Sequence, residues 1–304
     1  MIYPKADVAR AVGEDPQTAP IPELHKAMFR FAELFVNRSW QASPESLDVM
    51  RAEGVSDRDL ADWLQIACIQ TWFTHSADAG GIPMDRDAVS GPVMFRERSF
   101  YHAQPAPEPA PTTNPSVAAT LGWLHAPCTG ERYDAAARWA INHYGFVPNL
   151  FKSISACPDF YPRHQLALEL LERPQSKSLS AALHALVRAT VIALDHSSYF
   201  EPSAESLLHR EVEGVMDLDI LRKDPSEHIR DQQSLVVLRF VHKMVKNAYK
   251  ITGDDAQSFR EAGLSDETYI DVFNTVAIQQ SFDRLANCIG VAADTKPLLA
   301  RNNA

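Results

Sequence analysis

The residues best suited to acid–base or nucleophilic chemistry gather near position 195. The catalytic candidates are His184, Asp195, His196, Ser197 and Tyr199. Carboxylate, imidazole and hydroxyl groups are the usual parts of proton-transfer and acyl-transfer sites. Adjacent residues point in different directions, however, so the run DHSSY does not form a triad by sequence alone. The pattern favours a plainer interpretation, in which Asp195 or Ser198 caps the next helix and Pro202 lies in its first turn.

Weaker candidates flank this run on both sides. Glu201, Glu205 and His209 share one face if residues 201–213 are helical, and that spacing can bind a metal or exchange protons. A solvated helix face is the more common outcome of such a pattern. His184 and Arg188 lie one turn apart on the preceding helix, where a histidine is more often a hydrogen-bonded core residue than a base. The metal content therefore stays open.

The composition is that of an ordinary globular protein. The chain has 304 residues, of which 45% are hydrophobic and 22% charged, and a formal net charge of -10. This charge argues against nucleic acid or an anionic membrane as partner, because both need clustered positive charge. No apolar run is long enough to span a bilayer and the start lacks the apolar core of a signal peptide, so we expect a cytoplasmic protein. No nucleotide-binding motif is present, whereas haem and flavin need no short motif, and the cofactor is unknown.

Helical spacing dominates the chain, and we expect an all-α fold. Residues 22–37 carry an amphipathic stripe, and Ser43 followed by Pro44 marks the start of a second helix. Ser56 caps a long apolar helix that runs to Ala79 and is closed by two glycines. The aromatic residues of this region are expected to pack in the core; they are Trp40, Trp63, Trp72 and Phe73.

The same pattern recurs near the C-terminus at a constant offset of 209 residues, without a gap. About a dozen identities over roughly fifty positions favour a duplication over the chance register of two amphipathic helices. Matched pairs include Phe31 and Phe240, Gly54 and Gly263, Ser56 and Ser265, Gln70 and Gln279, and Phe73 and Phe282. Residues 131–194 hold further helices that have no counterpart in the first copy, so the first copy is partial.

Three stretches, 144–171, 179–214 and 262–291, carry a likeness to a known family. In order and spacing they resemble the peroxidase-related branch of the alkylhydroperoxidase D and carboxymuconolactone decarboxylase superfamily, over nearly all of residues 120–295. Residues 22–82 resemble only the closing part of that fold. The resemblance implies a partial unit at 1–95, a Pro-rich linker at 96–118 and a complete unit at 119–304. It also implies assembly as a homo-oligomer.

The resemblance does not carry the chemistry of the family over to this chain. That chemistry uses a C-x-x-C pair at a helix start, with a glutamate one helix earlier and a histidine one turn later. The two cysteine positions fall on Ser197 and Phe200, the glutamate position on Ala185 and the histidine position on Ala204. The four cysteines present are far apart and form no C-x-x-C; they are Cys68, Cys128, Cys157 and Cys288.

Three functions are compatible with these observations. The first is a non-redox enzyme or binding protein for a small hydrophobic or acidic molecule, since the superfamily includes a decarboxylase that works without the cysteine pair. The second is a non-catalytic pseudoenzyme or scaffold that pairs with an active partner. The third is a residual alkylhydroperoxidase activity through Cys157 or Cys288.

Overall fold

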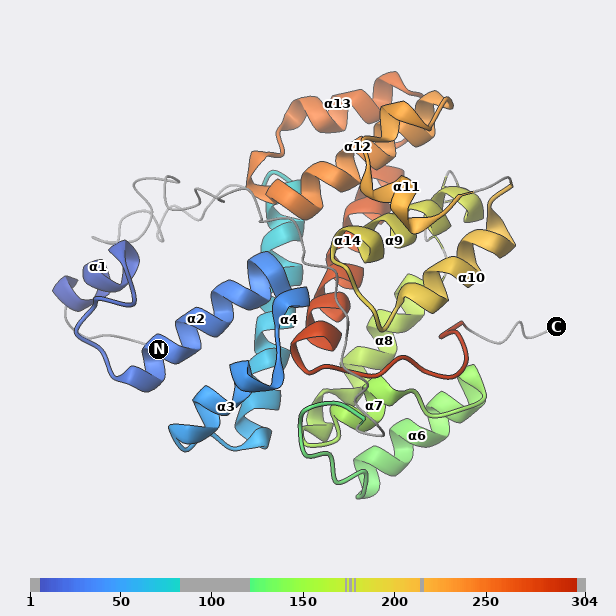
Figure 1. The fold of residues 1–304 in the computed structure, drawn as a ribbon. Helices are drawn as coiled ribbons and strands as arrows, with labels where there is room; N and C mark the ends of the chain where they lie inside the picture. The colour runs from blue at the N-terminus through green and yellow to red at the C-terminus, as the bar shows by residue number, and fades with distance from the viewer. Residues whose placement is uncertain are drawn as a thin grey trace.

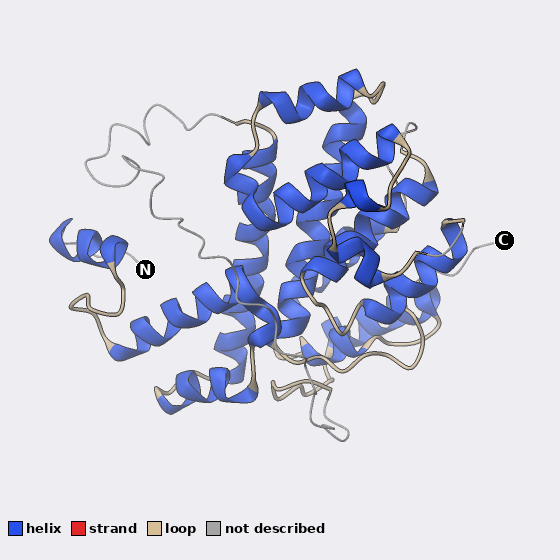
Figure 2. Ribbon diagram, turned by 45° about the horizontal axis from the view of Figure 1, so that its top comes forward, coloured by secondary structure: helices blue, strands red, loops and turns tan. Residues whose placement is uncertain are grey.

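The protein is built from helices (Figures 1 and 2). The computed structural model describes residues 6–82 and 121–299, except 173, 175, 176, 178, 214 and 215, and every regular element in these ranges is helical. This confirms the all-α prediction. None of the helices in the described ranges is long and apolar enough to cross a membrane. The expected boundaries at 95/96 and 118/119, and the linker between them, lie outside the described residues.

The first part of the chain forms four α-helices and a short 3-10 turn. They are α1 (Ala6–Glu14), α2 (Glu23–Arg38), η1 (Ser39–Gln41), α3 (Pro44–Ala52) and α4 (Asp57–Ala79). The expected caps are confirmed: Ser43 precedes α3, and the Ser56 side chain accepts a hydrogen bond from the Asp59 amide at the start of α4. These side chains satisfy amides that have no partner within the helix. Gly80 closes α4.

The second part holds the additional helices expected between residues 131 and 194, followed by the closing helices. Its elements are α6 (Glu131–Tyr144), α7 (Asn149–Ser153), η3 (Pro158–Phe160), α8 (Tyr161–Leu171), α9 (Ala181–Leu194), α10 (Glu201–Glu211), α11 (Leu218–Arg222), η4 (Pro225–Glu227), α12 (Gln232–Asn247), η5 (Ala248–Lys250), α13 (Gly253–Glu261) and α14 (Asp266–Cys288).

Helix α14 forms the centre of the molecule (Figure 1). It packs against α4 along much of its length, and α9, α12 and α8 pack against its other sides. The two long helices run antiparallel: Cys68 donates to the Ser281 carbonyl at 3.3 Å, and the Tyr269 hydroxyl donates to the Ala79 carbonyl at 2.8 Å. Almost all of α14 is buried as a result, including its polar residues.

The two matched segments have the same element lengths. The bounds of α12, η5, α13 and α14 each lie 209 residues after those of α2, η1, α3 and α4. The packing is also reciprocal, because η1 contacts α14 and η5 contacts α4. The correspondence fits a duplication, which stays a prediction because equal bounds do not establish common descent.

The aromatic residues of the first segment differ in their surroundings. Trp63 packs against Phe31 at a ring separation of 5.5 Å, and Trp40 packs against His196 at 5.1 Å, as expected for packing residues. The expectation for Phe73 is wrong, because its side chain is 63% exposed. The expectation rested on the large area that aromatic side chains bury, and residue type could not show whether another helix covers Phe73.

Candidate functional site

The turn between α9 and α10 brings the main candidates to the centre of the protein. Helix α9 begins at the Ser180 cap and ends at Leu194, and α10 begins at Glu201 after Phe200. The prediction that Asp195 or Ser198 caps α10 is therefore wrong, whereas Pro202 does lie in the first turn. Asp195 follows the last residue of α9 and is buried. Its carboxylate is directed toward α14 rather than toward the free amides of α10.

Helix α14 supplies the other half of this site. Its buried polar residues repeat at helical spacing, so they share adjacent faces of one helix. Those with amide or charged groups after residue 278 are Gln279, Gln280, Asp283, Arg284 and Asn287. Of these, the sequence singled out only Gln279, as the repeat match of Gln70. The available signal was the run QQSFDRLAN inside the long closing helix, where charged side chains that cannot reach solvent need partners.

Amide side chains connect the buried charges. The Gln280 amide donates to Asp195 Oδ1 at 3.3 Å, and Gln279 donates to Asp283 Oδ1 at 3.0 Å. Gln279 in turn accepts from Arg188 Nε at 3.3 Å. The arrangement links α9, the turn at Asp195 and α14 into one polar network that lies inside the core.

Both carboxyl groups have raised pKa values. Burial raises the pKa of Asp195 to about 6, against the opposing charge of Arg284. Burial and the negative charge of Asp195 raise the pKa of Asp283 well above its usual range. Both shifts favour the neutral acid, and the negative charge of Asp195 adds to the effect of burial at Asp283. Neighbouring carboxyls with separated pKa values are the arrangement from which acid–base pairs are made.

Several polar atoms of the site have no hydrogen-bond partner within the described part of the chain. They are Asp195 Oδ2, Ser197 Oγ, Gln280 Oε1, Asp283 Oδ2, Arg284 Nη1 and, near the start of α9, His184 Nε2. Buried polar groups in proteins are nearly always paired. Asp195 Oδ2 and Arg284 Nη1 therefore offer an acceptor and a cationic donor for a small polar molecule or ordered water.

The five predicted catalytic residues do not form one cluster. Ser197 is buried beside Asp283 and lowers its pKa, though less than burial raises it. His196 is half-buried, has a backbone φ of 48° and contacts Trp40, so it lies at the rim of the site. Burial and the charge of Arg222 lower the pKa of His196.

His184 and Tyr199 lie apart from the carboxyl pair. His184 precedes Asp195 by eleven residues, about 16 Å along the helix axis. Burial and the charge of Arg188 lower the pKa of His184 to about 3, which keeps its imidazole neutral. The Tyr199 hydroxyl donates a hydrogen bond to Asp294 Oδ2 at 2.6 Å. This bond links the turn before α10 to the segment that follows α14.

The weak metal candidates do not form a ligand group. No three His, Cys, Asp or Glu side chains in the described ranges gather closely enough to hold a metal ion. Residues 201–211 are helical as expected. Glu201, however, accepts a hydrogen bond from Arg222 at 2.9 Å, and Glu205 and His209 face solvent.

The thiols lie in environments that disfavour the thiolate. Burial raises the pKa of Cys68 and Cys288. Burial together with a hydrogen bond to Asp62 raises the pKa of Cys157 to about 12. A thiol must ionise to attack a peroxide, so these three cysteines lack the activation that the chemistry needs.

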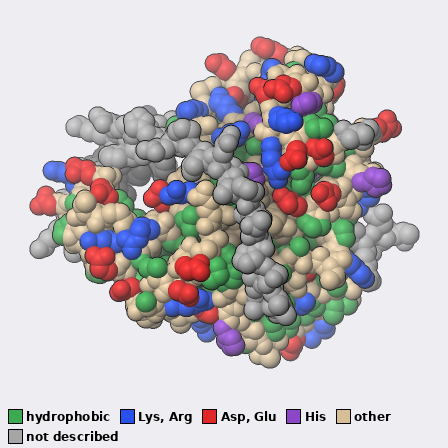
Figure 3. Space-filling view, viewed as in Figure 1, with side chains coloured by type: hydrophobic (Ala, Val, Ile, Leu, Met, Phe, Trp, Pro, Cys, Tyr) green, Lys and Arg blue, Asp and Glu red, His purple; other side chains and the backbone are tan. Residues whose placement is uncertain are grey.

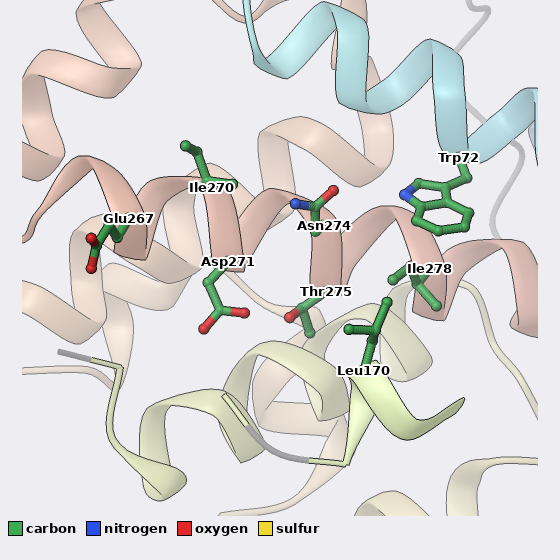
Figure 4. Close-up of a pocket in the computed structure, with 8 residues that line it drawn as sticks. All are labelled: Trp72, Leu170, Glu267, Ile270, Asp271, Asn274, Thr275 and Ile278. Carbon is green, nitrogen blue, oxygen red and sulfur yellow. The ribbon is translucent and has the colours of Figure 1, made fainter. Parts of the chain in front are cut away.

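A surface cavity of about 460 Å³ lies away from the carboxyl pair, where α4, α8 and α14 meet (Figure 4). Asp271 and Thr275 point to one side of α14 and Ile270 and Asn274 to the other. The lining residues are Trp72, Leu170, Glu267, Ile270, Asp271, Asn274, Thr275 and Ile278. None of the predicted catalytic residues is among them.

A solved structure with a similar fold is that of an uncharacterized peroxidase-related protein from a Silicibacter species. The two share a TM-score of 0.51 and 16% sequence identity, and the match covers 60% of this chain and 96% of that one. No protein-family model matches this chain, and no curated protein matches it. The chain thus has a fold similar to that of a peroxidase-related protein, and at this identity the likeness shows the fold alone.

Proposed function

We propose that this protein is a non-redox member of the alkylhydroperoxidase D and carboxymuconolactone decarboxylase superfamily that binds or converts a small molecule at the Asp195–Asp283 pair. The proposal treats residues 1–95 as a partial unit and 119–304 as a complete one. The observation that carries it is a buried carboxyl pair with separated pKa values, directly beside the position that the resemblance matches to the first redox cysteine, Ser197.

The chemistry of the pair favours a small acid or carbonyl compound. When protonated, the carboxyl of Asp283 can donate a hydrogen bond, and when ionised, the carboxylate of Asp195 can accept a proton. The guanidinium of Arg284 can stabilise an anionic oxygen. Each of these interactions is strengthened by burial, because the surroundings contain little mobile solvent. The half-buried His196 marks where the turn meets the surface.

A test of this proposal is native mass spectrometry of the chain purified without chelator, combined with elemental analysis. We expect a small acid at near-stoichiometric occupancy, lost in Asp283→Asn and Ser197→Ala and retained in the exposed neighbour control Ser198→Ala. Thermal shift with a panel of small carboxylic and 2-oxo acids provides a second readout. An empty wild-type chain that no compound of the panel stabilises would refute the proposal.

A non-catalytic scaffold is the second candidate function. Its supporting observation is that Asp195, Asp283, Arg188 and Arg284 are all buried and interact with one another, as expected of a network that only fixes the packing of α9 on α14. A pulldown at native protein concentration tests it. A stable protein partner, together with no bound small molecule, would favour this function over the first.

Residual thiol peroxidase activity has the least support. Its proposed carriers, Cys157 and Cys288, have raised pKa values. We expect consumption of cumene hydroperoxide with dithiothreitol to equal that of a variant in which all four cysteines are serine. A wild-type rate clearly above that of the variant would reinstate this activity.

A further inference from the structure

The segment before α6 is held by its main chain at the start of α4. The carbonyl of Trp123 accepts a hydrogen bond from Arg51 Nη2 at 2.6 Å, and the amide of His125 donates to Asp57 Oδ2 at 2.6 Å. Arg51 and Asp57 also pair with each other at 2.7 Å. This ion pair therefore offers one donor and one acceptor to a passing backbone, and it recognises main-chain groups rather than side chains.

The same segment contacts the end of α14. The Trp123 amide donates to the Ile289 carbonyl at 2.8 Å. The Trp123 ring lies directly over Gly290, where an added methyl group would overlap it. The segment is thus recognised by two main-chain bonds to the ion pair, one to α14, and an aromatic ring on a bare glycine. We define the occupied clamp as Arg51, Asp57 and Gly290.

The ion pair of the occupied clamp recurs in the second copy of the repeated pattern. At the offset of 209 residues, Arg51 and Asp57 correspond to Arg260 and Asp266. Arg260 Nε pairs with Asp266 Oδ1 at 2.8 Å, and the same two atoms join Arg51 and Asp57. Both arginines lie in the last turn of the shorter helix, and both aspartates begin the long helix. The second pair is therefore held in the same local geometry as the first.

The glycine of the occupied clamp recurs as well. Gly290 corresponds to Gly81, and their backbone φ angles are 59° and 61°. The Tyr269 hydroxyl donates to the Ala79 carbonyl at 2.8 Å, so the end of α4 lies beside the start of α14. The antiparallel helices thus place the second glycine near the second ion pair. We define the open clamp as Arg260, Asp266 and Gly81.

No described segment of the chain occupies the open clamp. The side chains of Arg260 and Asp266 are 51% and 66% exposed, against 29% and 21% for Arg51 and Asp57. A methyl group added at Gly81 would meet no described atom within 4 Å. Figure 3 shows acidic and basic side chains together over α13, at the top of the view. The open clamp therefore has the binding groups of its counterpart and lacks the bound segment among the described residues.

We propose that the open clamp binds a non-helical segment of another protein that carries an aromatic residue. The aromatic ring covers Gly81, the carbonyl of the same residue accepts from Arg260, and the amide two residues later donates to Asp266. The corresponding segment of a second copy is not available, because its main chain is already bound in its own occupied clamp. The proposal is independent of the carboxyl pair and of the function assigned to it.

Isothermal titration calorimetry of the full chain with a blocked peptide tests the proposal. The probe has the sequence of residues 121–127, LGWLHAP, because this segment fits the occupied clamp. We expect a dissociation constant of about 100 µM or below. Arg260→Ala and Asp266→Ala should each weaken binding at least about 10-fold, because each removes a charge-assisted hydrogen bond. Gly81→Asn should do the same, since asparagine tolerates a positive φ and its side chain blocks the ring.

The charge-matched control is Asp254→Ala, at an exposed position in the first turn of α13, and it should bind the peptide as the wild type does. Two altered peptides test the recognised groups: one has alanine in place of tryptophan, and one is N-methylated at the histidine amide. Each should bind at least about 10-fold more weakly. Far-UV circular dichroism establishes that each variant is folded.

Two results would overturn the proposal. The first is a wild-type chain that does not bind the peptide at a concentration of about 1 mM. The second is binding that either Arg260→Ala or Asp266→Ala leaves unchanged, because the peptide would then occupy another surface or displace the segment in the occupied clamp.

Discussion

The raised pKa of Asp195 predicts a specific dependence of stability on pH. Burial raises this pKa to about 6 in the folded protein, whereas an aspartate in an unfolded chain has a pKa of about 3.9. The folded state therefore binds the proton more tightly. The resulting stabilisation is fully present below about pH 4 and is lost as the pH rises through about 6. A difference of about two units corresponds to about 3 kcal/mol.

Replacing Asp195 by Asn should remove this dependence. Asparagine carries no charge and can still accept the hydrogen bond of Gln280 through Oδ1. The difference in free energy of unfolding between Asp195→Asn and the wild type should change by about 2 kcal/mol from about pH 4 to pH 7, in favour of the variant. Urea unfolding of both proteins at these pH values measures it.

Only the difference between the two proteins is informative. The buried imidazoles of His75, His164 and His184 have pKa values lowered to about 3, mainly by burial. They favour unfolding as the pH falls, and they do so in both proteins. The control is Asp254→Asn, at an exposed position of α13. Its free energy of unfolding should differ from that of the wild type by the same amount at every pH. A constant difference for Asp195→Asn as well would refute the assignment of a raised pKa.

Three further predictions concern stability and are checked by chemical denaturation near neutral pH. Asp283→Asn should change the free energy of unfolding by less than about 1 kcal/mol at pH 7, because the raised pKa of Asp283 favours the neutral acid, which asparagine resembles. A loss above about 3 kcal/mol would show that an ionised group had been removed. Phe200→Ala should lower the free energy of unfolding by about 3 to 5 kcal/mol, because the ring is completely buried. A decrease below about 1 kcal/mol would contradict that burial. Gly290→Ala should lower the free energy of unfolding by at least about 1 kcal/mol, because the added methyl would overlap the Trp123 ring and φ is 59°. An unchanged midpoint would contradict this geometry.

Sequence patterns predicted the helices well because their ends are set locally. The caps Ser43 and Ser56 and the closing Gly80 act through bonds within a few residues. The cap assigned to Asp195 failed for the opposite reason. Its carboxylate is taken by Gln280, which is 85 residues away and on another helix. Neither periodicity nor cap preference carries information about such a partner.

The candidate site was predictable only on the α9 side. The turn at residues 195–200 was found through its residue types and its family resemblance, but Asp283 and Arg284 belong to a helix that had been interpreted as closing structure. Phe73 shows the same limit on the outside of the protein. Its aromatic side chain predicted a packing role, whereas its exposure depends on the absence of a covering helix among the described residues.

Burial also disfavours thiol chemistry at the position of Ser197. The pKa values of Asp195 and Asp283 are raised and those of Arg188 and Arg284 are lowered, so burial disfavours charge of either sign. A thiolate is subject to the same cost. Cys288, one turn after Arg284, has a raised pKa although that arginine opposes the shift. A cysteine introduced at Ser197 would therefore remain a thiol, and the same environment that favours a neutral acid on Asp283 would prevent its attack on a peroxide.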